Sequence, residues 1–328
     1  MKQLIIFLFF SISTTLAMGQ NNYQEYDNFI KRADSLYRVK DYKNAALSYS
    51  AAFKSIGWIG TQNDRYNAAC SWALAGVADS AFFQLNRIAT KANFIDYAHI
   101  TTDADLNSLH QDKRWQPLLQ IIKQNKDKTE ANYNKPLVAQ LDSVYINDQK
   151  YRQQIDTIEK KYGWESKEMK SLWKVIDEKD SVNLIKVKNI LDKYGWLGDD
   201  VIGERGSQAL FLVIQHADPA TQEKYLPMMR EAVKNKKASG SNLALLEDRV
   251  ALEQGKKQIY GSQIGRDQET GKPYILPLED PDNVDKRRAA VGLQPLSDYV
   301  SQWQIKWDVE QYKKGLQATE AKGKAGHK

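Results

Sequence analysis

A group of polar residues in the second half of the chain has the side-chain types that catalytic sites use. Its members are His216, Asp218, Asp248, Arg249, Tyr260, Gln263 and Arg287. An imidazole has a reference pKa of about 6.5, so His216 can accept or release a proton near neutral pH. One hypothesis is therefore a hydrolase or transferase with His216 as its general base, acting on a sugar, peptide or phosphate from the cell envelope.

The other members of the group can be given roles that follow from their chemistry. Asp248 would orient the imidazole, and Arg249 or Arg287 would hold an anionic substrate through two parallel hydrogen bonds. Tyr260 and Gln263 would donate hydrogen bonds to an oxyanion that develops during the reaction. A structure can test this hypothesis, which expects His216, Asp248, Tyr260, Gln263 and Arg287 to line one cleft within reach of one another. Scattered and individually satisfied side chains would contradict this form of the site.

The same residues also have a structural interpretation, which we prefer at this stage. A histidine at the end of a buried helix, beside an aspartate such as Asp218 that begins the next helix, is usually a capping residue. Neighbouring acidic and basic residues such as Asp248 and Arg249 are usually a structural ion pair. The sequence has no nucleophile elbow, no phosphate-binding glycine loop and no paired-histidine zinc helix.

Metal and redox chemistry are also disfavoured by the composition. The chain has 1 cysteine, Cys70, and 4 histidines, which excludes an internal disulfide and leaves little material for a cysteine- or histidine-built metal site. Cys70 falls within an apolar helical pattern and should be buried. We predict no cofactor and no metal.

The segments around the candidate residues are predicted to be mostly helical. Residues 206–217 are the most apolar stretch after the N-terminus and predict a buried helix that ends near His216. Asp218-Pro219 is typical of a cap and first turn, so another helix should follow at once, with a kink or delay at Pro227. Further helices are predicted over 165–178, 181–194 and 242–254. A loop at 195–206 should separate the helix 181–194 from the buried helix 206–217.

After Gln258 the helical spacing of apolar residues gives way to an alternation of apolar and polar residues that is typical of extended segments. The two segments around the turn-rich stretch 267–271 predict a short β-hairpin or a pair of extended loops. Asp280-Pro281 then begins a helix that should run to Gly292. The fold class predicted is mainly α, with helical hairpins followed by a mostly helical domain that contains one short hairpin or extended loop.

The second half also resembles a bacterial domain family of undefined function over about residues 137–300. The resemblance rests on an ordered set of short segments: Asp148-Gln149 with Arg152, YGW at 194–196, VIGERG at 201–206, QHAD at 215–218, EDRV at 247–250, QIYGSQ at 258–263, and Asp282-Asn283 to Arg287-Arg288 followed by GLQPL. Such a family implies an exported or cytoplasmic domain that often occurs beside repeats. It implies no particular reaction.

The first half contains an internal repeat. Residues 26–57 and 65–90 place small and large apolar side chains at similar positions, with an interval of 36 residues between Ala45 and Ala81. The repeated positions are Phe29, Ala33, Leu36, Tyr42, Ala45, Tyr49 and Ala52 in one segment and Ala69, Trp72, Gly76, Ala81 and Leu85 in the other. These segments resemble tetratricopeptide repeats, although the usual proline at the end of each unit is missing.

The resemblance to tetratricopeptide repeats implies a role in binding. Small residues let paired helices approach closely, and a stack of such pairs presents a concave face that suits a peptide or protein segment. The stretch after the repeats, 96–122, resembles the capping element that ends many bacterial arrays. The concave face is equally well explained as a surface for packing against the second half of the same chain.

The N-terminus is typical of a secretory signal peptide. Lys2 is followed by an uninterrupted apolar run at 4–10, and Ala17 and Gly19 supply small side chains for cleavage after Gly19. The apolar run is shorter than a membrane span requires, so we expect no transmembrane segment in the mature chain. We predict a periplasmic or secreted protein.

Composition and charge complete the expected organisation. The net charge of +6 is spread along the chain without a basic block, which disfavours nucleic-acid binding. The predicted divisions are a signal peptide at 1–19, repeats at 23–125, a linker at 126–136, a helical domain at 137–310 and a disordered or frayed tail at 311–328. The preferred function is that of an exported envelope protein that binds a protein or peptide through its repeats. The oligomeric state stays open.

Overall fold

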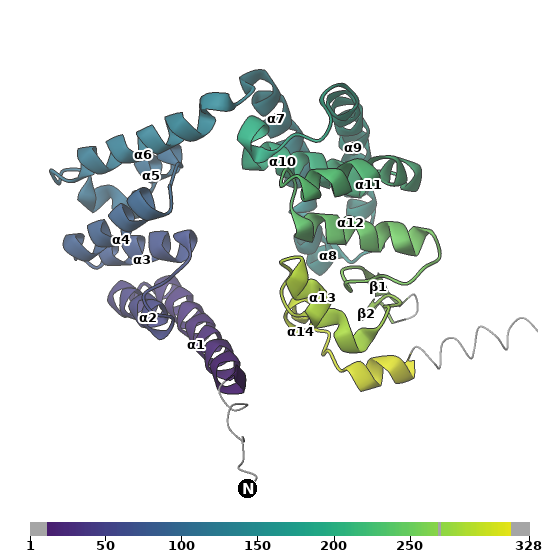
Figure 1. The fold of residues 1–328 in the computed structure, drawn as a ribbon, viewed down its shortest axis with the longest axis horizontal. Helices are drawn as coiled ribbons and strands as arrows, with labels where there is room; N and C mark the ends of the chain where they lie inside the picture. Colours follow the sequence, from purple (N-terminus) through teal and green to yellow (C-terminus); the bar gives the residue numbers. More distant parts are fainter. Residues whose placement is uncertain (1–11, 268–269, 316–328) are drawn as a thin grey trace, which may run out of the picture. The chain divides into compact units, whose positions relative to one another are not determined.

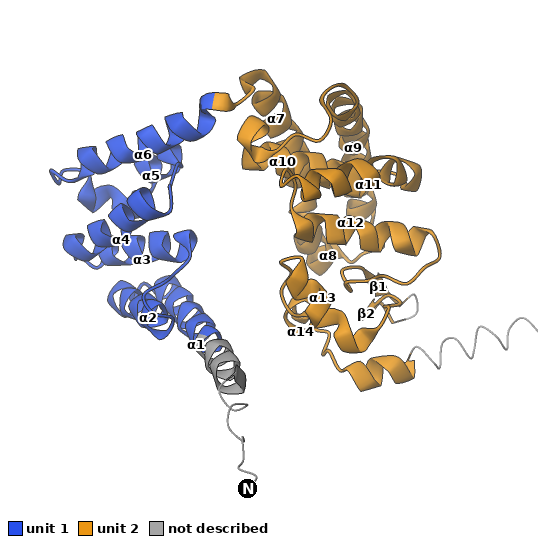
Figure 2. Ribbon diagram, in the orientation of Figure 1, with its two compact units in different colours: residues 1–131 blue, residues 132–328 orange. Residues whose placement is uncertain are grey.

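The protein folds into two units that are mainly α-helical. The structure is a computed structural model that describes residues 12–267 and 270–315. Unit 1 ends at Ala131 and unit 2 begins at Asn132 (Figure 2). This junction falls inside the predicted linker at 126–136, although the first part of that range is helical. No helix in the described part of the chain is long and apolar enough to cross a membrane.

Unit 1 is a series of short helices that pack in sequence order (Figure 1). They are α1 (Ile12–Arg38), α2 (Tyr42–Ser55), α3 (Gln62–Leu74), α4 (Ala78–Lys91), α5 (Tyr97–Thr102), the 3-10 helix η1 (Ala104–Leu109), α6 (Trp115–Thr129) and the 3-10 turn η2 (Glu130–Asn132). Helices α1 and α2 form one pair, and α3 and α4 form the next. Ala45, Ala69 and Ala81 are fully buried, as expected of the small residues that allow paired helices to approach closely.

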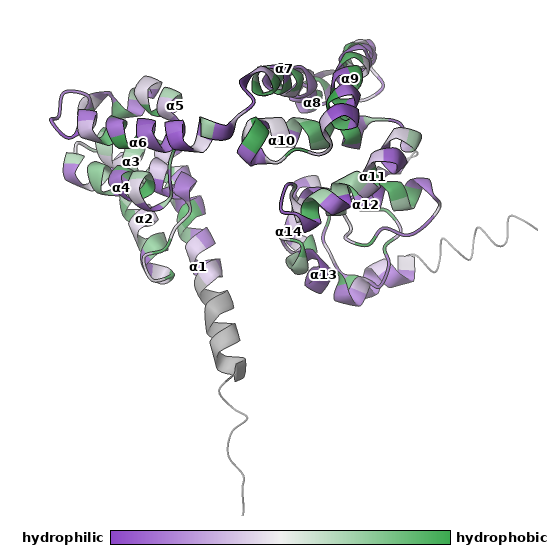
Figure 3. Ribbon diagram, turned by 45° about the horizontal axis from the view of Figure 1, so that its top comes forward, coloured by the Kyte–Doolittle hydropathy of each residue, from purple (hydrophilic) through white to green (hydrophobic). Residues whose placement is uncertain are grey.

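Unit 2 consists of a longer helical part and a small C-terminal part. Its helices are α7 (Lys135–Arg152), α8 (Ile155–Tyr162), α9 (Lys167–Tyr194), α10 (Asp199–His216), α11 (Pro219–Lys234), α12 (Gly240–Glu253), α13 (Val284–Ala290) and α14 (Leu296–Val300), with 3-10 turns η3 (Pro281–Asn283) and η4 (Ser301–Trp303). Apolar and polar residues alternate along these helices, as expected of amphipathic helices around a core (Figure 3). The main core lies between α7, α9, α10, α11 and α12.

The single sheet of the described residues is a short antiparallel hairpin. Strand β1 (Ile264–Arg266) pairs with β2 (Pro273–Ile275), with Gly265 opposite Tyr274. A side chain at position 265 would come within 2.8 Å of the Tyr274 ring, so the glycine leaves room for the cross-strand tyrosine in its present position. The mainly α fold with one short hairpin, predicted from the sequence, is therefore confirmed.

Two predicted boundaries in unit 2 are wrong. The two helices predicted at 165–178 and 181–194 form one continuous helix, α9. Ser181 does not begin a new helix, because its hydroxyl donates to the carbonyl of Asp177 one turn earlier and the helix continues. The loop predicted at 195–206 is mostly helical, since α10 begins at Asp199 and bends at Gly203, where φ is 69°.

The boundaries predicted around His216 agree with the structure, whereas those at Pro227 and after Asp280 do not. Helix α10 ends at His216, and Asp218 caps α11 by accepting a hydrogen bond from the Thr221 amide. Helix α11 continues through Pro227. After Asp280-Pro281, a 3-10 turn and the short α13 replace the longer helix that was predicted to reach Gly292.

The segments predicted at the two chain ends lie largely outside the described residues. The apolar run of the predicted signal peptide and most of the predicted tail at 311–328 are in this category. Residues 309–315 are helical, and Tyr312 packs in the C-terminal core and donates to the Leu276 carbonyl. The first residues of the predicted tail therefore belong to the folded unit.

Candidate functional site

Three helices of unit 2 bring an acidic pair and a histidine together. Helices α7, α9 and α10 pack on one another and supply Asp148, Asp180 and His216 respectively. The His216 Nδ1 atom lies 2.9 Å from Asp148 Oδ1, and the Asp148 side chain is only 1% exposed. The imidazole is 21% exposed, so a buried carboxylate holds the Nδ1 atom of a ring that keeps some solvent contact.

Arg152 completes this cluster from α7. Its guanidinium donates to both carboxylate oxygens of Asp180, at 2.9 and 2.5 Å, and lies 3.3 Å from Asp148 Oδ1. Burial raises the pKa of Asp148, but the hydrogen bond from His216 and the nearby charges of His216 and Arg152 outweigh burial and lower it. Asp148 is therefore held as a carboxylate.

The ionised state of Asp148 fixes the proton on the imidazole. A carboxylate can only accept hydrogen bonds, so Nδ1 of neutral His216 must carry the proton that is donated to Asp148. The lone pair is then on Nε2, which has no partner among the described residues. This is the arrangement that a histidine general base requires.

The same cluster has the residue types of a metal site. Ligand atoms of Asp148, Asp180 and His216 lie within 4.8 Å of one another. However, the Arg152 guanidinium already binds both carboxylates and supplies the positive charge that a cation would bring. The donor set therefore does not fit a metal unless Arg152 moves away.

His216 also lines a pocket of about 360 Å³, which we call the basic pocket. The other lining residues are Phe211, Leu212, Gln215, Leu245, Arg249, Ser262, Gln263, Ile264, Arg266, Pro273, Tyr299 and Trp303. They include two arginines and no acidic side chain. Among the described residues, the guanidinium of Arg249 has no hydrogen-bond or ion-pair partner, and its Nε atom is buried.

Burial also affects the pKa of Arg249. Loss of solvent contact lowers the pKa of this guanidinium, Glu253 raises it, and the like charge of Arg152 lowers it further. An arginine stays charged even so. A guanidinium that has lost part of its hydration and makes no hydrogen bond is costly, and an anion in the basic pocket would reduce that cost.

Asp248 does not orient His216, which corrects the prediction. It is fully buried and accepts hydrogen bonds from the backbone amides of Ile259, Tyr260 and Ser262 at 2.6, 2.9 and 2.9 Å. Burial raises the pKa of Asp248, and these three amides oppose the increase. Asp248 therefore shapes the loop 258–263 that forms one wall of the basic pocket.

Arg287 and Tyr260 also belong to the support of this loop and not to the pocket. Arg287 donates to the carbonyls of Ile259, Glu279 and Asp280. Its neighbour Arg288 is fully buried, donates to the Tyr260 carbonyl and stacks on the Tyr299 ring. Neither Arg287 nor Tyr260 lines the basic pocket, so the predicted roles of Arg287 in holding a substrate and of Tyr260 in stabilising an oxyanion are not part of this site.

Asp218 lies on the other side of His216. With Asp177, Asp180 and His216 it lines a separate pocket of about 260 Å³. Its carboxylate accepts from the amide and the hydroxyl of Thr221, and these hydrogen bonds lower its pKa. The structural interpretation, an N-cap for α11, is correct for this residue.

The structure thus brings together His216, Arg249 and Gln263 but not the rest of the predicted group. Sequence reasoning overlooked the true partner of the imidazole, Asp148, and its neighbours Arg152 and Asp180. Asp148 and Arg152 were among the segments that carried the family resemblance, which was the available signal. No sequence signal pointed to Asp180, because its position depends on how α9 packs against α7.

Unit 1 has a pocket of a different character, which we call the acidic pocket. It has a volume of about 550 Å³ and is lined by Asp34, Tyr37, Arg38, Tyr49, Tyr66, Asn67, Cys70, His99, Asp103 and Asp105. Three tyrosine hydroxyls donate to three carboxylates: Tyr37 to Asp105, Tyr49 to Asp34 and Tyr66 to Asp103. The Cys70 thiol is buried as predicted, and burial with the nearby carboxylates raises its pKa. Its ligand atom lies within 4.8 Å of those of Asp103 and Asp105.

These features define unit 2 as a mainly helical domain with a buried carboxylate–histidine pair beside a basic pocket. The chain belongs to the Family of unknown function (DUF6624), whose model matches residues 135–309, more than half of the chain. A family of undefined function is what the resemblance of the second half implied. No curated protein and no solved structure matches the chain.

Proposed function

We propose that unit 2 binds an anionic substrate at Arg249 and uses the His216–Asp148 pair as a general base, as a hydrolase or transferase. The observation that carries this proposal is that Arg249, whose guanidinium has no partner among the described residues, and His216 line the same pocket. The proposed site differs from the one predicted from the sequence, because Asp148 replaces Asp248 as the partner of His216. Asp218, Asp248, Tyr260 and Arg287 have structural roles in this proposal.

The electrostatics of the basic pocket support an anion. Arg249 and Arg266 line it, and no carboxylate does. Arg266 is already paired with Glu159 and lies over the Trp164 ring, so Arg249 is the cation left to meet a substrate. A guanidinium binds a carboxylate or phosphate through parallel hydrogen bonds.

The base chemistry is supported by the same geometry. Asp148 holds the imidazole so that Nε2 can accept a proton from water or from a substrate hydroxyl. The interactions of Asp148 with His216, and to a smaller extent with Arg152, lower its pKa and keep it ionised. General-base catalysis by a positioned histidine contributes about 10²- to 10⁴-fold in rate. The expected reactions are hydrolysis of an ester or phosphoester bond, or transfer of the group to another acceptor.

Anion binding can be tested first with inorganic phosphate as the probe. We expect phosphate to shift the ¹⁵N resonances of the His216 ring in the full-length protein, and the variant His216→Gln assigns those resonances among the four histidines. Arg249→Gln should abolish the shift. Arg230→Gln is the matched control, because Arg230 is an exposed surface arginine. Equal responses of the two variants would contradict the proposal.

Catalysis requires a separate measurement. Full-length protein is incubated with p-nitrophenyl esters of phosphate, acetate and butyrate, and release of nitrophenolate is recorded. We expect turnover of at least one anionic or ester probe, lowered by about 10²-fold or more in His216→Gln. Turnover that is unchanged in this variant would place the chemistry elsewhere.

A second candidate function rests on unit 1. The acidic pocket lies in the segment that resembles tetratricopeptide repeats, and its carboxylates outnumber Arg38 and His99. It suits a basic peptide, in keeping with a repeat that binds a protein partner outside the cytoplasm after removal of a signal peptide. Binding of a pentalysine peptide that is weakened by Asp103→Asn, but not by the exposed Asp79→Asn, is the expected result.

A further inference from the structure

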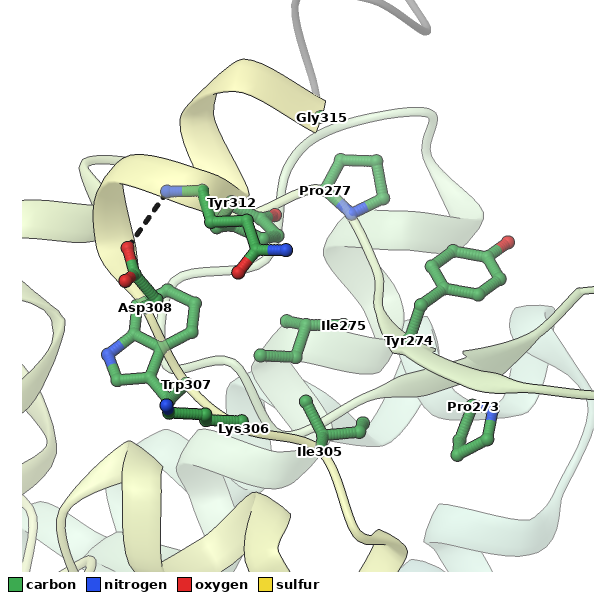
Figure 4. Close-up of a pocket in the computed structure, with 11 residues that line it drawn as sticks. Pro273, Tyr274, Ile275, Pro277, Ile305, Lys306, Trp307, Asp308, Tyr312 and Gly315 are labelled. Carbon is green, nitrogen blue, oxygen red and sulfur yellow. Dashed lines mark hydrogen bonds between the residues drawn. The ribbon is translucent and has the colours of Figure 1, made fainter.

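An apolar pocket lies beside the basic pocket at the C-terminal end of unit 2. Its volume is about 420 Å³. Strand β2 and the residues after it supply Pro273, Tyr274, Ile275 and Pro277, and the C-terminal segment supplies Ile305, Trp307 and Tyr312 (Figure 4). The polar groups Lys306, Asp308 and Gln311 also contribute to the lining. Such a lining favours an apolar group over a charged one.

The two pockets are adjacent. Pro273 lines both of them, and the short segment from Trp303 to Ile305 passes from the basic pocket to the apolar pocket. Tyr299 and Trp303, whose rings meet edge to face, add aromatic surface to the basic pocket. Pro273 is thus the border that a ligand with its charged group at Arg249 would cross to place an apolar chain near Ile275 and Ile305.

We propose that the substrate is an amphipathic anion, which carries an alkyl or acyl chain on the charged group. The charged group pairs with Arg249 and lies beside His216, and the chain occupies the apolar pocket. This inference rests on the proposed function, since it assigns the substrate class of the same site. A substrate of this class would also explain why the apolar pocket lies next to the basic pocket, because one ligand would fill both.

The test uses a series of n-alkyl phosphates, from methyl to octyl, below the concentrations at which they form micelles. Binding to the full-length protein is measured by calorimetry. Burial of each added methylene group corresponds to about a fourfold gain in affinity. We expect affinity to rise by about this factor at each step until the apolar pocket is filled, and then to level off.

Variants separate the contributions of the two pockets. Tyr274 lines the apolar pocket and is 47% exposed, so Tyr274→Ser should reduce the gain per methylene while leaving methyl phosphate binding unchanged. Tyr194→Ser is the matched control, since Tyr194 is 43% exposed and lines neither pocket. Ile305→Ser is a second variant of the same pocket. Arg249→Gln should weaken the whole series by a similar factor.

Each alternative result has a distinct meaning. If methyl phosphate binds through Arg249 and longer chains bind no more tightly, the amphipathic substrate is excluded while the proposed function stands. If octyl phosphate binds equally well to Arg249→Gln, the apolar pocket acts alone and the shared ligand is excluded. If no member of the series binds, the proposed anion site fails as well.

Discussion

Unit 2 contains two buried aspartates that are equally shielded from solvent but have different hydrogen-bond partners and opposite pKa shifts. Asp148 is 1% exposed and Asp248 is 0% exposed. Asp148 pairs with an imidazole and a guanidinium, and its pKa is lowered. Asp248 accepts from three backbone amides, and burial raises its pKa.

The difference shows that the partner of a buried carboxylate, and not its burial, indicates its role. Backbone amides cannot titrate or move independently, so Asp248 fixes the shape of a loop. An imidazole can titrate and has a second nitrogen, so Asp148 can direct chemistry at that nitrogen. Asp248 acts on the site only through Ser262 and Gln263, which its loop places in the basic pocket.

The largest expected effect is on stability, in Asp248→Ala. Three buried amides would lose their acceptor, and each unsatisfied group costs about 1–3 kcal/mol. We expect the free energy of unfolding, measured with urea, to fall by about 3 kcal/mol or more. Asp142→Ala is the control, because the ion pair of Asp142 with Arg205 is largely exposed and should contribute less than about 1 kcal/mol. Similar losses in both variants would contradict the structural role of Asp248.

Asp148→Asn should have a smaller effect on stability and a specific effect on His216. Hydrogen bonds to charged groups contribute about 1.5–3 kcal/mol, so we expect a loss near 2 kcal/mol. An amide can also donate to Nδ1, which allows the other tautomer of the ring. The ¹⁵N shifts of His216 should therefore change from an Nδ1–H pattern to a mixture. A ring that keeps the Nδ1–H pattern would exclude control by Asp148.

The pH dependence of this stability difference sharpens the comparison. The pKa of Asp148 is lower in the folded protein than its usual value of about 3.9. The ionised form therefore stabilises the fold above about pH 4, and this contribution is lost as the pH falls further. The gap in unfolding free energy between the native protein and Asp148→Asn should shrink between pH 5 and pH 3. A constant gap would mean that the charge of Asp148 contributes nothing.

Much of this arrangement follows from local sequence. The end of α10 at His216 and the cap at Asp218 were predictable, because an apolar helical pattern stops where an Asp-Pro pair begins. Gly163 and Gly195 likewise end α8 and α9 with positive φ. The mainly α fold needed no more than these signals.

The partner of His216 could not be found in this way. Asp148 lies 68 residues before His216 and was overlooked in favour of Asp248, which is closer in sequence and precedes an arginine. Local patterns reveal which residues share a helix face, but the contact between α7 and α10 depends on packing of the whole core. Asp180 was missed for the same reason, and also because α9 was predicted as two helices.

The smallest expected effect concerns Asp218, a third aspartate near His216. Replacing an N-cap aspartate with alanine costs about 1 kcal/mol, so Asp218→Ala should lower the unfolding free energy by that amount. Asp218→Asn keeps a capping oxygen for the Thr221 amide and should restore most of the stability. Phosphate binding, recorded from the His216 ring, should be unchanged in both variants. If Asp218→Asn is stable but alters phosphate binding, the charge of Asp218 belongs to the site, and the distinction between capping and chemical carboxylates around His216 must be redrawn.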